Sequence, residues 1–301
     1  MSNSCGRVSI ERRVLHPVEI ESAGTLKLIG GGTMSRLYLS VATLILAFSV
    51  GAVVAAPQAT EEAVSARLWL GRAAEIEEFL NTAEVVRTED LSVGVTKPMR
   101  CYFAPGGLIE SMTFKKIKPG RHGGFWESYK ADIAAYELDK LLGLEMIPPT
   151  VEKRVDGSLG AAVMWTAPTK SFKEMGGPPT PPAGQTVPWY KQIARAKMFD
   201  NLINNKDPNL GNWLVDPAWN LILIDHTRAF VSGKKMVHEM NRIDKELWER
   251  MMALDEETLK STLEHWIGGG QIKNLLERRD QMKKEIEKMV AKRGEQAVFF
   301  N

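Results

Sequence analysis

The stretch "NNKDPNLGNWLVDPAWNLILIDHTRAF", residues 204 to 230, gathers acidic and amide side chains around a short apolar run. Four residues separate Asp207 from Asn212, and the runs WLV and LILI that follow can pair as a hairpin with Asp225 at its end. Asn and Asp also favour ordinary turns, so the same residues fit a polar turn followed by a surface hairpin. The alternative is a site that holds a metal ion and a phosphate group, and the rest of the sequence has to decide between the two interpretations.

The composition is that of an ordinary globular protein. The chain has 301 residues, 44% of them hydrophobic and 25% charged, which is enough to bury the core of one large domain or of two lobes. Its formal net charge is +2, and the two signs are mixed along the chain without a basic stripe interleaved with aromatic residues. Nucleic acid is therefore not expected as a partner.

The N-terminal part predicts export. Residues 37 to 56 carry no charge, follow Arg36 and end in small residues, which is the order of a signal peptide cleaved after Ala55. Twenty apolar residues would also span a bilayer, so a membrane anchor over residues 34 to 56 is the alternative. Because a signal peptide normally stands at the start of a protein, we expect translation to begin at Met34, with residues 1 to 33 not translated. The predicted location is periplasmic or otherwise extracytoplasmic, or the inner membrane if the segment is not cleaved.

Cysteine usage excludes a disulfide framework in the predicted mature protein. Cys5 lies before Met34, so Cys101 would be the single remaining cysteine. One thiol cannot form an intramolecular disulfide or a Cys-based zinc cluster. Because Cys101 lies in a strand-like stretch, we expect it to be a small buried hydrophobic side chain.

The order of predicted elements beyond the N-terminal extension, residues 57 to 93, indicates two lobes. A helix is predicted over residues 71 to 84, and two hairpins with a helix over 126 to 144 between them predict a β-rich lobe over 94 to 168. The first hairpin turns at Pro105-Gly106-Gly107 and the second at Asp156-Gly157.

The second half of the chain is predicted to be largely helical. Residues 169 to 188 are rich in Pro and Gly, which predicts a linker or a surface insertion. The helical lobe, 189 to 301, begins with a helix over 189 to 205 and is helical in pattern after Phe230, ending in an amphipathic helix over 272 to 293. The predicted fold class is α+β, with two lobes and a cleft between them.

The residue types of a phosphoryl-transfer site occur in this order of elements. Such a site needs a carboxylate near the acceptor hydroxyl, an Asn and a second carboxylate for magnesium, and a β-lobe Lys for the nucleotide phosphates. Asp207 and Asn212 have the D-x-x-x-x-N spacing of a kinase catalytic loop, and Asp225 leaves a strand where it can ligate magnesium. Their order favours the metal and phosphate interpretation over a simple turn.

The β-lobe lysine is expected in the run MTFK. Alternation along a strand puts Thr113 and Lys115 on one face and Lys116 on the other, so a regular strand would bring Lys115 to the phosphates. The following helix must supply an acid to hold this lysine, and Asp132 and Glu137 are the two candidates.

Four segments together resemble a known family. MTFKKIKPG, YKADIAAYELDKLLGLEMIPPTVEKRVDGSLG, NNKDPNLGNWLV and LILIDHTRAF follow one another as in the bacterial branch of the phosphatidylinositol 3- and 4-kinase-like superfamily, which includes the HipA-type serine kinases. The resemblance covers the chain from about residue 95 to residue 285. It implies an atypical kinase fold that binds ATP with Mg2+.

The resemblance also implies roles for particular residues. They are Asp207 as the catalytic aspartate, Asn212 and Asp225 as metal ligands, Lys115 as the phosphate contact, Asp132 as its acidic partner, and Met164, Trp165 and Thr166 as the interlobe hinge beside the adenine. The chain departs from the family in two places, because Pro208-Asn209 stands where Arg-His is common and Asp132 is one methylene shorter than the usual Glu. His226 and Arg228 fit the family pattern, whereas Gly106-Gly107 is a weak substitute for a G-x-G-x-x-G loop.

Three functions are compatible with these residues. The first is an ATP-dependent phosphotransferase acting on a hydroxyl of a protein or a small molecule. The second is an exported, catalytically inactive pseudokinase that acts as a binding module, because ATP is scarce outside the inner membrane. The third is transfer of AMP on the same fold. A membrane is expected as a partner only if the N-terminal segment stays uncleaved.

Overall fold

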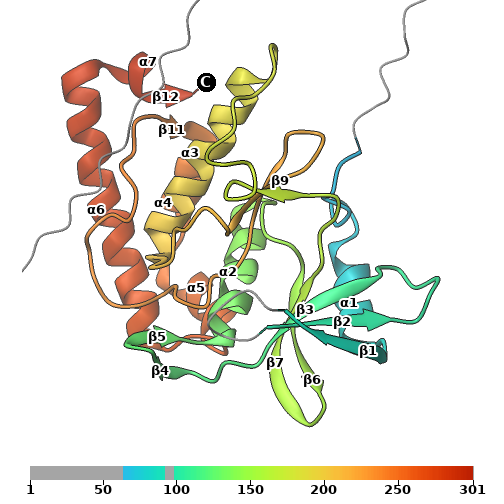
Figure 1. The fold of residues 1–301 in the computed structure, drawn as a ribbon. Helices are drawn as coiled ribbons and strands as arrows, with labels where there is room; N and C mark the ends of the chain where they lie inside the picture. Colours follow the sequence, from blue (N-terminus) through green and yellow to red (C-terminus); the bar gives the residue numbers. More distant parts are fainter. Residues whose placement is uncertain (1–63, 92–97, 301) are drawn as a thin grey trace, which may run out of the picture. The chain divides into compact units, whose positions relative to one another are not determined.

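The computed structural model describes residues 64 to 91 and 98 to 300 (Figure 1). The predicted start at Met34, the signal peptide and the cleavage after Ala55 lie outside the described residues. Within those two ranges, no helix combines the length and the apolar character needed to cross a membrane.

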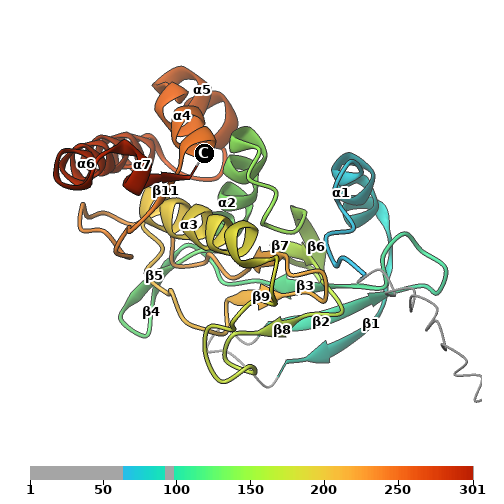
Figure 2. The same cartoon turned by 90° about the horizontal axis from the view of Figure 1, so that it is seen from above.

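The first lobe is a five-stranded antiparallel sheet on which two helices pack, and Figures 1 and 2 show both helices on one side of the sheet. In sheet order, its strands are β1 (Val85–Asp90), β2 (Met99–Phe103), β3 (Ser111–Lys115), β7 (Ser158–Met164) and β6 (Thr150–Val155). The helices α1 (Ala73–Thr82) and α2 (Tyr129–Leu142) both contact β6 and β7. A small hairpin, β4 (Gly120–His122) with β5 (Phe125–Glu127), connects β3 to α2.

The second lobe is mainly helical. Its helices are α3 (Thr186–Ile203), α4 (Lys245–Ala253), α5 (Glu256–Leu263), α6 (Gly269–Arg293) and α7 (Glu295–Val298). Its strands form a small sheet in the order β10 (Leu221–Leu223), β9 (Trp213–Val215) and β8 (Lys170–Ser171), and a parallel pair of β11 (Ile243–Asp244) with β12 (Phe299–Phe300). The architecture confirms the predicted α+β fold with a β-rich lobe and a helical lobe.

Strand β10 of the hairpin β9–β10 is buried between the two cores, and β9 is partly buried. Leu221 and Leu223 belong to the core of the helical lobe, whereas Ile222 belongs to the core under the five-stranded sheet. Successive side chains of a strand point to opposite faces, so a run that is apolar at every position suits a strand with a core on each side. This placement fixes the residues that follow β10 at the junction of the lobes.

Helix α2 is held at both ends and buried on several faces. The Ser128 hydroxyl accepts a hydrogen bond from the Lys130 amide at the N-terminus, and Gly143 ends the helix with a left-handed backbone, φ 54°. Its side chains join the helical core, as Leu138 does, and also pack on the sheet, as Ile133 does beside β7. Because the helix is buried on several faces, some of its polar side chains, such as that of Asp132, are also buried.

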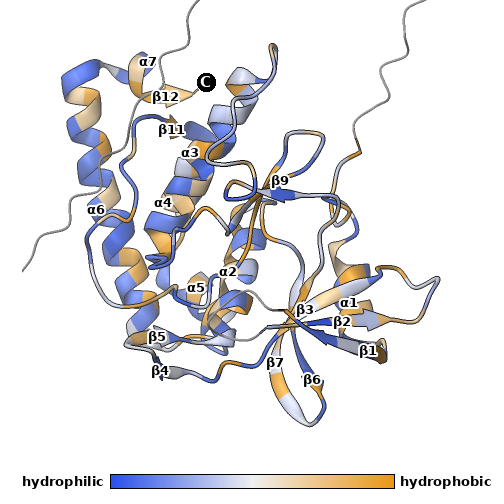
Figure 3. Ribbon diagram, in the orientation of Figure 1, coloured by the Kyte–Doolittle hydropathy of each residue, from blue (hydrophilic) through white to orange (hydrophobic). Residues whose placement is uncertain are grey.

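Two predicted features of the cores are present. Cys101 is buried in the core under the sheet, and burial raises the pKa of its thiol to about 11. The predicted helix over 272 to 293 is α6, which buries Ile272, Leu275 and Met282, while Figure 3 shows hydrophilic residues over much of the helix. Both features follow from the local apolar pattern.

Several elements differ from the sequence prediction. The edge strand β1 was not predicted, because its exposed residues VVRTED lack an apolar alternation. The predicted helix start at residue 126 is wrong, since Phe125–Glu127 form β5 and the helix begins at Tyr129. The Gly123-Gly124 pair at the tip of the β4–β5 hairpin is the turn signal that identifies it.

The helical lobe also differs in detail. Helix α3 starts at Thr186, inside the predicted linker, because Pro188 lies in its first turn, where a missing N–H breaks no helical hydrogen bond. Residues 170 and 171 form β8. The chain after Phe230 is not helical throughout, because β11 and β12 pair with each other and residues 231 to 242 form bends and irregular segments.

Candidate active site

Lys115 lies between two aspartates from other elements. Its Nζ is 2.9 Å from Oδ1 of Asp225 and 3.2 Å from Oδ2 of Asp132. Lys115 and Asp132 are 7% and 3% exposed, whereas Lys116 is on the surface. Of the two acids proposed on the helix, Asp132 therefore holds Lys115, and Glu137 pairs instead with Lys140 at 3.1 Å.

The shorter side chain of Asp132 is sufficient for this contact. Its two carboxylate oxygens both lie within 3.3 Å of the Lys115 nitrogen. Its Oδ1 also accepts a hydrogen bond from the backbone amide of His226 at 2.7 Å. Asp132 thus ties β3 to the segment that follows β10.

Asp225 leaves β10 through an unusual backbone conformation. Its φ is +62°, in the left-handed region that Asp tolerates better than most residues because of its short polar side chain. The turn directs its carboxylate toward Lys115, and the hydroxyl of Thr227 donates to the same oxygen at 3.1 Å. These contacts hold the Asp225 carboxylate in place where the two lobes meet.

Asn212 stands opposite the end of β10. Its backbone carbonyl accepts from the Ile224 amide at 3.0 Å, which extends the β9–β10 ladder to the residue before Asp225. Its side-chain Nδ2 donates to the carbonyl oxygen of Asp207 at 3.1 Å, so its Oδ1 is the amide atom suited to ligate a metal. Among the described residues, no group of three or more His, Cys, Asp or Glu side chains could hold a metal ion.

Asp207 is held at both carboxylate oxygens. Asn209 Nδ2 donates to Oδ1 at 2.9 Å, and Arg228 lies 3.5 Å from Oδ2. The Asp207 amide donates to the side chain of Asn205, whose own Nδ2 donates to Asp200 in α3. The Asn-rich start of the quoted stretch thus anchors the loop to the end of α3.

Burial and charge together determine the ionisation of the Lys115 cluster. Burial alone would lower the pKa of Lys115, but the two carboxylates outweigh it and raise that pKa overall. Burial raises the pKa of Asp132, whereas for Asp225 the neighbouring lysine outweighs burial and lowers the pKa. Burial lowers the pKa of His226, which favours its neutral form. Asp225 is therefore the aspartate of this cluster that is more readily kept as an anion.

The predicted hinge residues lie where the chain leaves the five-stranded sheet. Met164 ends β7, the amide of Trp165 donates to the carbonyl of Ser111, and Thr166 is buried. The guanidinium of Arg100 lies 4.1 Å from the centre of the Trp165 ring. This link leads directly to β8 and the helical lobe.

Gly106-Gly107 is at the wrong end of the sheet to cover phosphates. Tyr102 pairs with Ser111, so the turn that carries these glycines lies about 13 Å along the strand from Lys115. A Cβ atom on Gly107 would come within 2.7 Å of the Phe79 ring, so close packing against α1 accounts for this glycine. The end of β1 and the start of β2 lie beside the Lys115 end of β3, because Asp90 pairs with Met99 and Met99 with Phe114.

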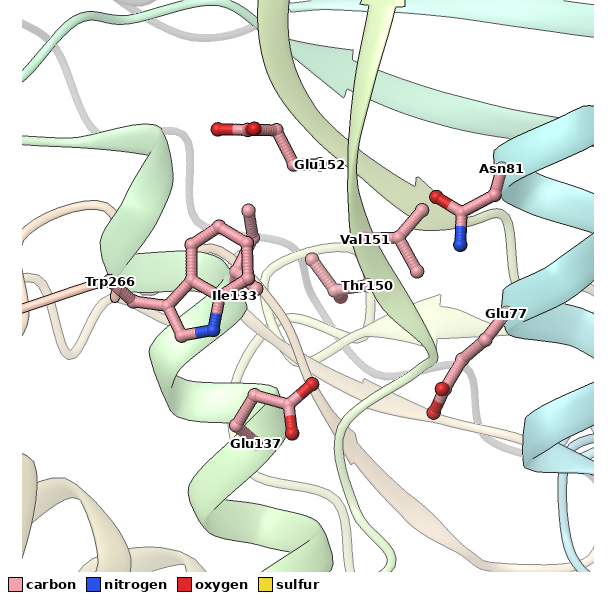
Figure 4. A pocket seen from close by; sticks show the side chains of 8 residues that line it. All are labelled: Glu77, Asn81, Ile133, Glu137, Thr150, Val151, Glu152 and Trp266. Carbon is pink, nitrogen blue, oxygen red and sulfur yellow. The ribbon is translucent and has the colours of Figure 1, made fainter. Parts of the chain in front are cut away.

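A separate cavity of about 320 Å3 opens between α1, α2 and β6 (Figure 4). Its lining residues are Glu77, Asn81, Ile133, Glu137, Thr150, Val151, Glu152 and Trp266. Of the residues considered for the phosphoryl-transfer site, the described lining of this cavity includes Glu137, the candidate acid that pairs with Lys140 instead of Lys115, and not the others. We therefore locate the candidate site by the contacts among Lys115, Asp132 and Asp225, and not by this cavity.

One buried acid near the site was missed at the sequence level. Glu127, at the end of β5, is 1% exposed and accepts a hydrogen bond from Nε of Arg228. Recognition of the Gly123-Gly124 turn would have placed Glu127 on a strand instead of in a helix, but its partner lies 101 residues away.

Comparisons with known proteins support the fold. No protein-family model matches the chain, and no curated protein sequence is similar to it. The Golgi casein kinase with Mn/ADP bound superposes with a TM-score of 0.58 and 14% sequence identity, over 75% of this chain and 78% of that chain. The hydra Fam20 structure with sugar gives a TM-score of 0.60 and 14% identity, over 76% of this chain and 92% of that chain. The chain therefore has a two-lobed, kinase-like fold.

Proposed function

We propose that this protein is an ATP- and magnesium-dependent phosphotransferase that acts on a hydroxyl group of a protein or a small molecule. The observation that carries the proposal is Lys115 of β3, held by Asp132 of α2 and by Asp225 after β10. A kinase-like fold hosts several chemistries, so the argument rests on this cluster and on the loop beside it. The likeness to a kinase solved with Mn/ADP adds support for a nucleotide and a divalent cation.

The donor set of the site fits a hard divalent cation. Asn212 and Asp225 offer an amide oxygen and a carboxylate oxygen, which are the ligand types that magnesium prefers, and nucleotide phosphates and water usually complete its coordination. A bound cation of this kind would supply charge neutralisation at the phosphates. We assign Asn212 and Asp225 to the metal for this reason.

The remaining residues have distinct roles in the proposed reaction. Lys115 would contact the nucleotide phosphates, with Asp132 orienting its ammonium group. Asp207 would accept the proton of the acceptor hydroxyl, since its carboxylate is already oriented by Asn209 and Arg228. Met164, Trp165 and Thr166 would contact the adenine.

We further propose that the chain is related to the bacterial phosphatidylinositol 3- and 4-kinase-like and HipA-like kinases and is exported. The four sequence segments support the relationship, and the uncharged run over residues 37 to 56 supports export. Their order in the sequence is also the order of β3, α2, the loop that carries Asp207, and β10 along the chain. The proposal specifies only the hydroxyl group of the acceptor, because the residues assigned to the site are those that would bind the nucleotide and the metal.

Thermal denaturation with nucleotides tests the proposal. A ligand that binds only the folded state at a hundred times its Kd stabilises it by about 2.7 kcal/mol, which corresponds to a Tm increase of roughly 5–11 °C for a domain of this size. We expect this increase with ATP and Mg2+, and a much smaller one with ATP and EDTA. The absence of a Tm shift with ATP, ADP or AMP, with or without Mg2+, would refute nucleotide binding.

Labelled ATP separates the three functions. With purified protein and a panel of protein and small-molecule hydroxyl acceptors, phosphoryl transfer moves the γ-label to a product, whereas AMP transfer moves the α-label. A Tm shift without movement of either label would favour the pseudokinase function. Movement of the γ-label, abolished by EDTA, is the expected result.

A further inference from the structure

Arg228 is held by three groups from different parts of the chain. Its Nε is 2.5 Å from Glu127 Oε1, its Nη1 is 3.5 Å from Asp207 Oδ2, and its guanidinium carbon lies 4.3 Å from the centre of the Phe125 ring. The side chain of Arg228 is 16% exposed, and that of Asp207 is 28% exposed. A single guanidinium thus connects the β4–β5 hairpin with the loop that carries Asp207.

The hairpin is built to hold this guanidinium. Phe125 and Glu127 are two residues apart in β5, so strand alternation places both on the face that meets Arg228. A backbone hydrogen bond of 2.9 Å, from the Ser128 amide to the Thr227 carbonyl, fixes the two segments beside each other. The geometry therefore does not depend on a surface ion pair alone.

Glu127 depends on Arg228 for its charge balance. Its carboxylate is 1% exposed, and its Oε2 is buried without a hydrogen-bond partner. A buried carboxylate is costly unless a cation faces it, and among the described residues Arg228 is the cation that forms an ion pair with Glu127. Glu127 will therefore keep the guanidinium at the end of β5, close to the start of α2.

The segment from Asp207 to Asn212 supplies no cation of its own to the Asp207 carboxylate. From Asp207 to Asn212 the chain reads DPNLGN, which contains no positive charge. Asn209 satisfies one carboxylate oxygen of Asp207, and Arg228 reaches the other from the segment after β10. A forked guanidinium can face two carboxylates at once, and Arg228 turns Nε to Glu127 and Nη1 to Asp207.

We propose that Arg228 is a positioning residue for Asp207, and that Glu127, through Arg228, couples this carboxylate to the start of α2. The inference rests on the proposed function, because it assigns how the proposed base is oriented. The same helix carries Asp132, the partner of Lys115. A displacement of the β5–α2 junction would therefore disturb the phosphate-binding lysine and the proposed base together.

The test uses the full chain with Arg228→Met, Arg228→Lys and Glu127→Gln. Arg121→Met is the matched control, because Arg121 lies in the same hairpin but is exposed, and its guanidinium donates to the carbonyl of Gly124, at 3.5 Å, instead of to a carboxylate of the site. Arg228→Met should lower kcat for γ-label transfer by about 10- to 100-fold, with the Kd for ATP and Mg2+ within about twofold. Arg228→Lys should recover part of kcat, Glu127→Gln should lower it less, and the control should be unchanged.

An equal loss of ATP affinity and of kcat in Arg228→Met would overturn the positioning role, as would an unchanged kcat. If Arg228→Met fails to fold because Glu127 is left buried and unpaired, the double variant Glu127→Gln/Arg228→Met removes both charges. It should regain the fold and still transfer slowly. A refolded double variant with the kcat of the parent would contradict the proposal.

Hydrogen exchange separates this inference from the proposed function. If the parent transfers no label, the phosphotransferase proposal fails, and amide exchange over residues 204 to 212 then decides the positioning role. Arg228→Met and Glu127→Gln should speed exchange in this loop, whereas Arg121→Met should not. Exchange at the rate of the parent in both variants would overturn the inference.

Discussion

Replacing Lys115 by Met removes the cation that serves two carboxylates. The ammonium lies 2.9 Å from Asp225 and 3.2 Å from Asp132, and the side chain is 8% exposed. Removing one partner of a buried ion pair leaves an uncompensated charge and typically costs about 3–5 kcal/mol of unfolding free energy. We expect a loss of at least about 3 kcal/mol at pH 8, or a Tm decrease of roughly 6–12 °C.

The loss should depend on pH in a defined direction. In the parent, Lys115 lowers the pKa of Asp225, and this contribution to stability is present at neutral pH and disappears as the pH falls through that lowered pKa. In Lys115→Met, burial and mutual repulsion raise the pKa of both aspartates, so the variant gains stability as the pH falls and they become neutral. The difference between parent and variant should therefore be largest at pH 8 and smaller at pH 5.

Urea unfolding at pH 5 and pH 8 measures both effects. Lys116→Met is the control, because Lys116 is exposed, and its unfolding free energy should stay within about 0.5 kcal/mol of the parent. The Lys115 variant should also lose ATP affinity, whereas the control should keep it. Equal destabilisation by both substitutions, or a Lys115→Met penalty that is the same at both pH values, would refute the ion-pair argument.

Three further predictions concern other residues. Asp225→Asn should strongly weaken Mg2+-dependent ATP binding in calorimetry, whereas Asp207→Asn should keep that binding and lower any transfer rate by at least about a hundredfold; undiminished binding in Asp225→Asn would falsify the metal assignment. Burial raises the pKa of Asp139 to about 7, so this group should lower the unfolding free energy as the pH rises from about 4 to 7, and Asp139→Asn should remove that contribution from the pH dependence measured by urea unfolding; the same pH dependence in parent and variant would count against a raised pKa. N-terminal sequencing from fractionated cells should find a mature start near Ala56, and an intact cytoplasmic protein that begins at Met1 would contradict export.

The parts of the fold that could be predicted have local causes. Hairpins β2–β3, β6–β7 and β9–β10 combine apolar runs with turn residues, and α2 combines helical spacing with Gly143 as its end. The strand register of β3 also follows from alternation, which is why Lys115 could be separated from Lys116. These features can be predicted from residues that are close together in the sequence.

The parts that could not be predicted depend on contacts between distant segments. Asp132 and Glu137 are five residues apart, so they project from α2 in different directions, and only the position of β3 decides which one meets Lys115. The same holds for Glu127 and Arg228, which come from different elements. Strand β1 gave no signal because an exposed edge strand needs no apolar face.

The charge balance at the lobe junction is unfavourable for stability alone. Lys115 faces Asp132 and Asp225, and Arg228 faces Glu127 and Asp207, so two cations are shared by four carboxylates. An arrangement selected only for stability would pair each buried carboxylate or replace it by an apolar side chain. Departures of this kind are expected where a protein binds a charged ligand, because the uncompensated groups are those that the ligand will meet. A divalent cation with a nucleotide would supply the missing positive charge beside Asp225 and place phosphates near Lys115, which is why this excess of carboxylates favours a binding site over a purely structural ion-pair network.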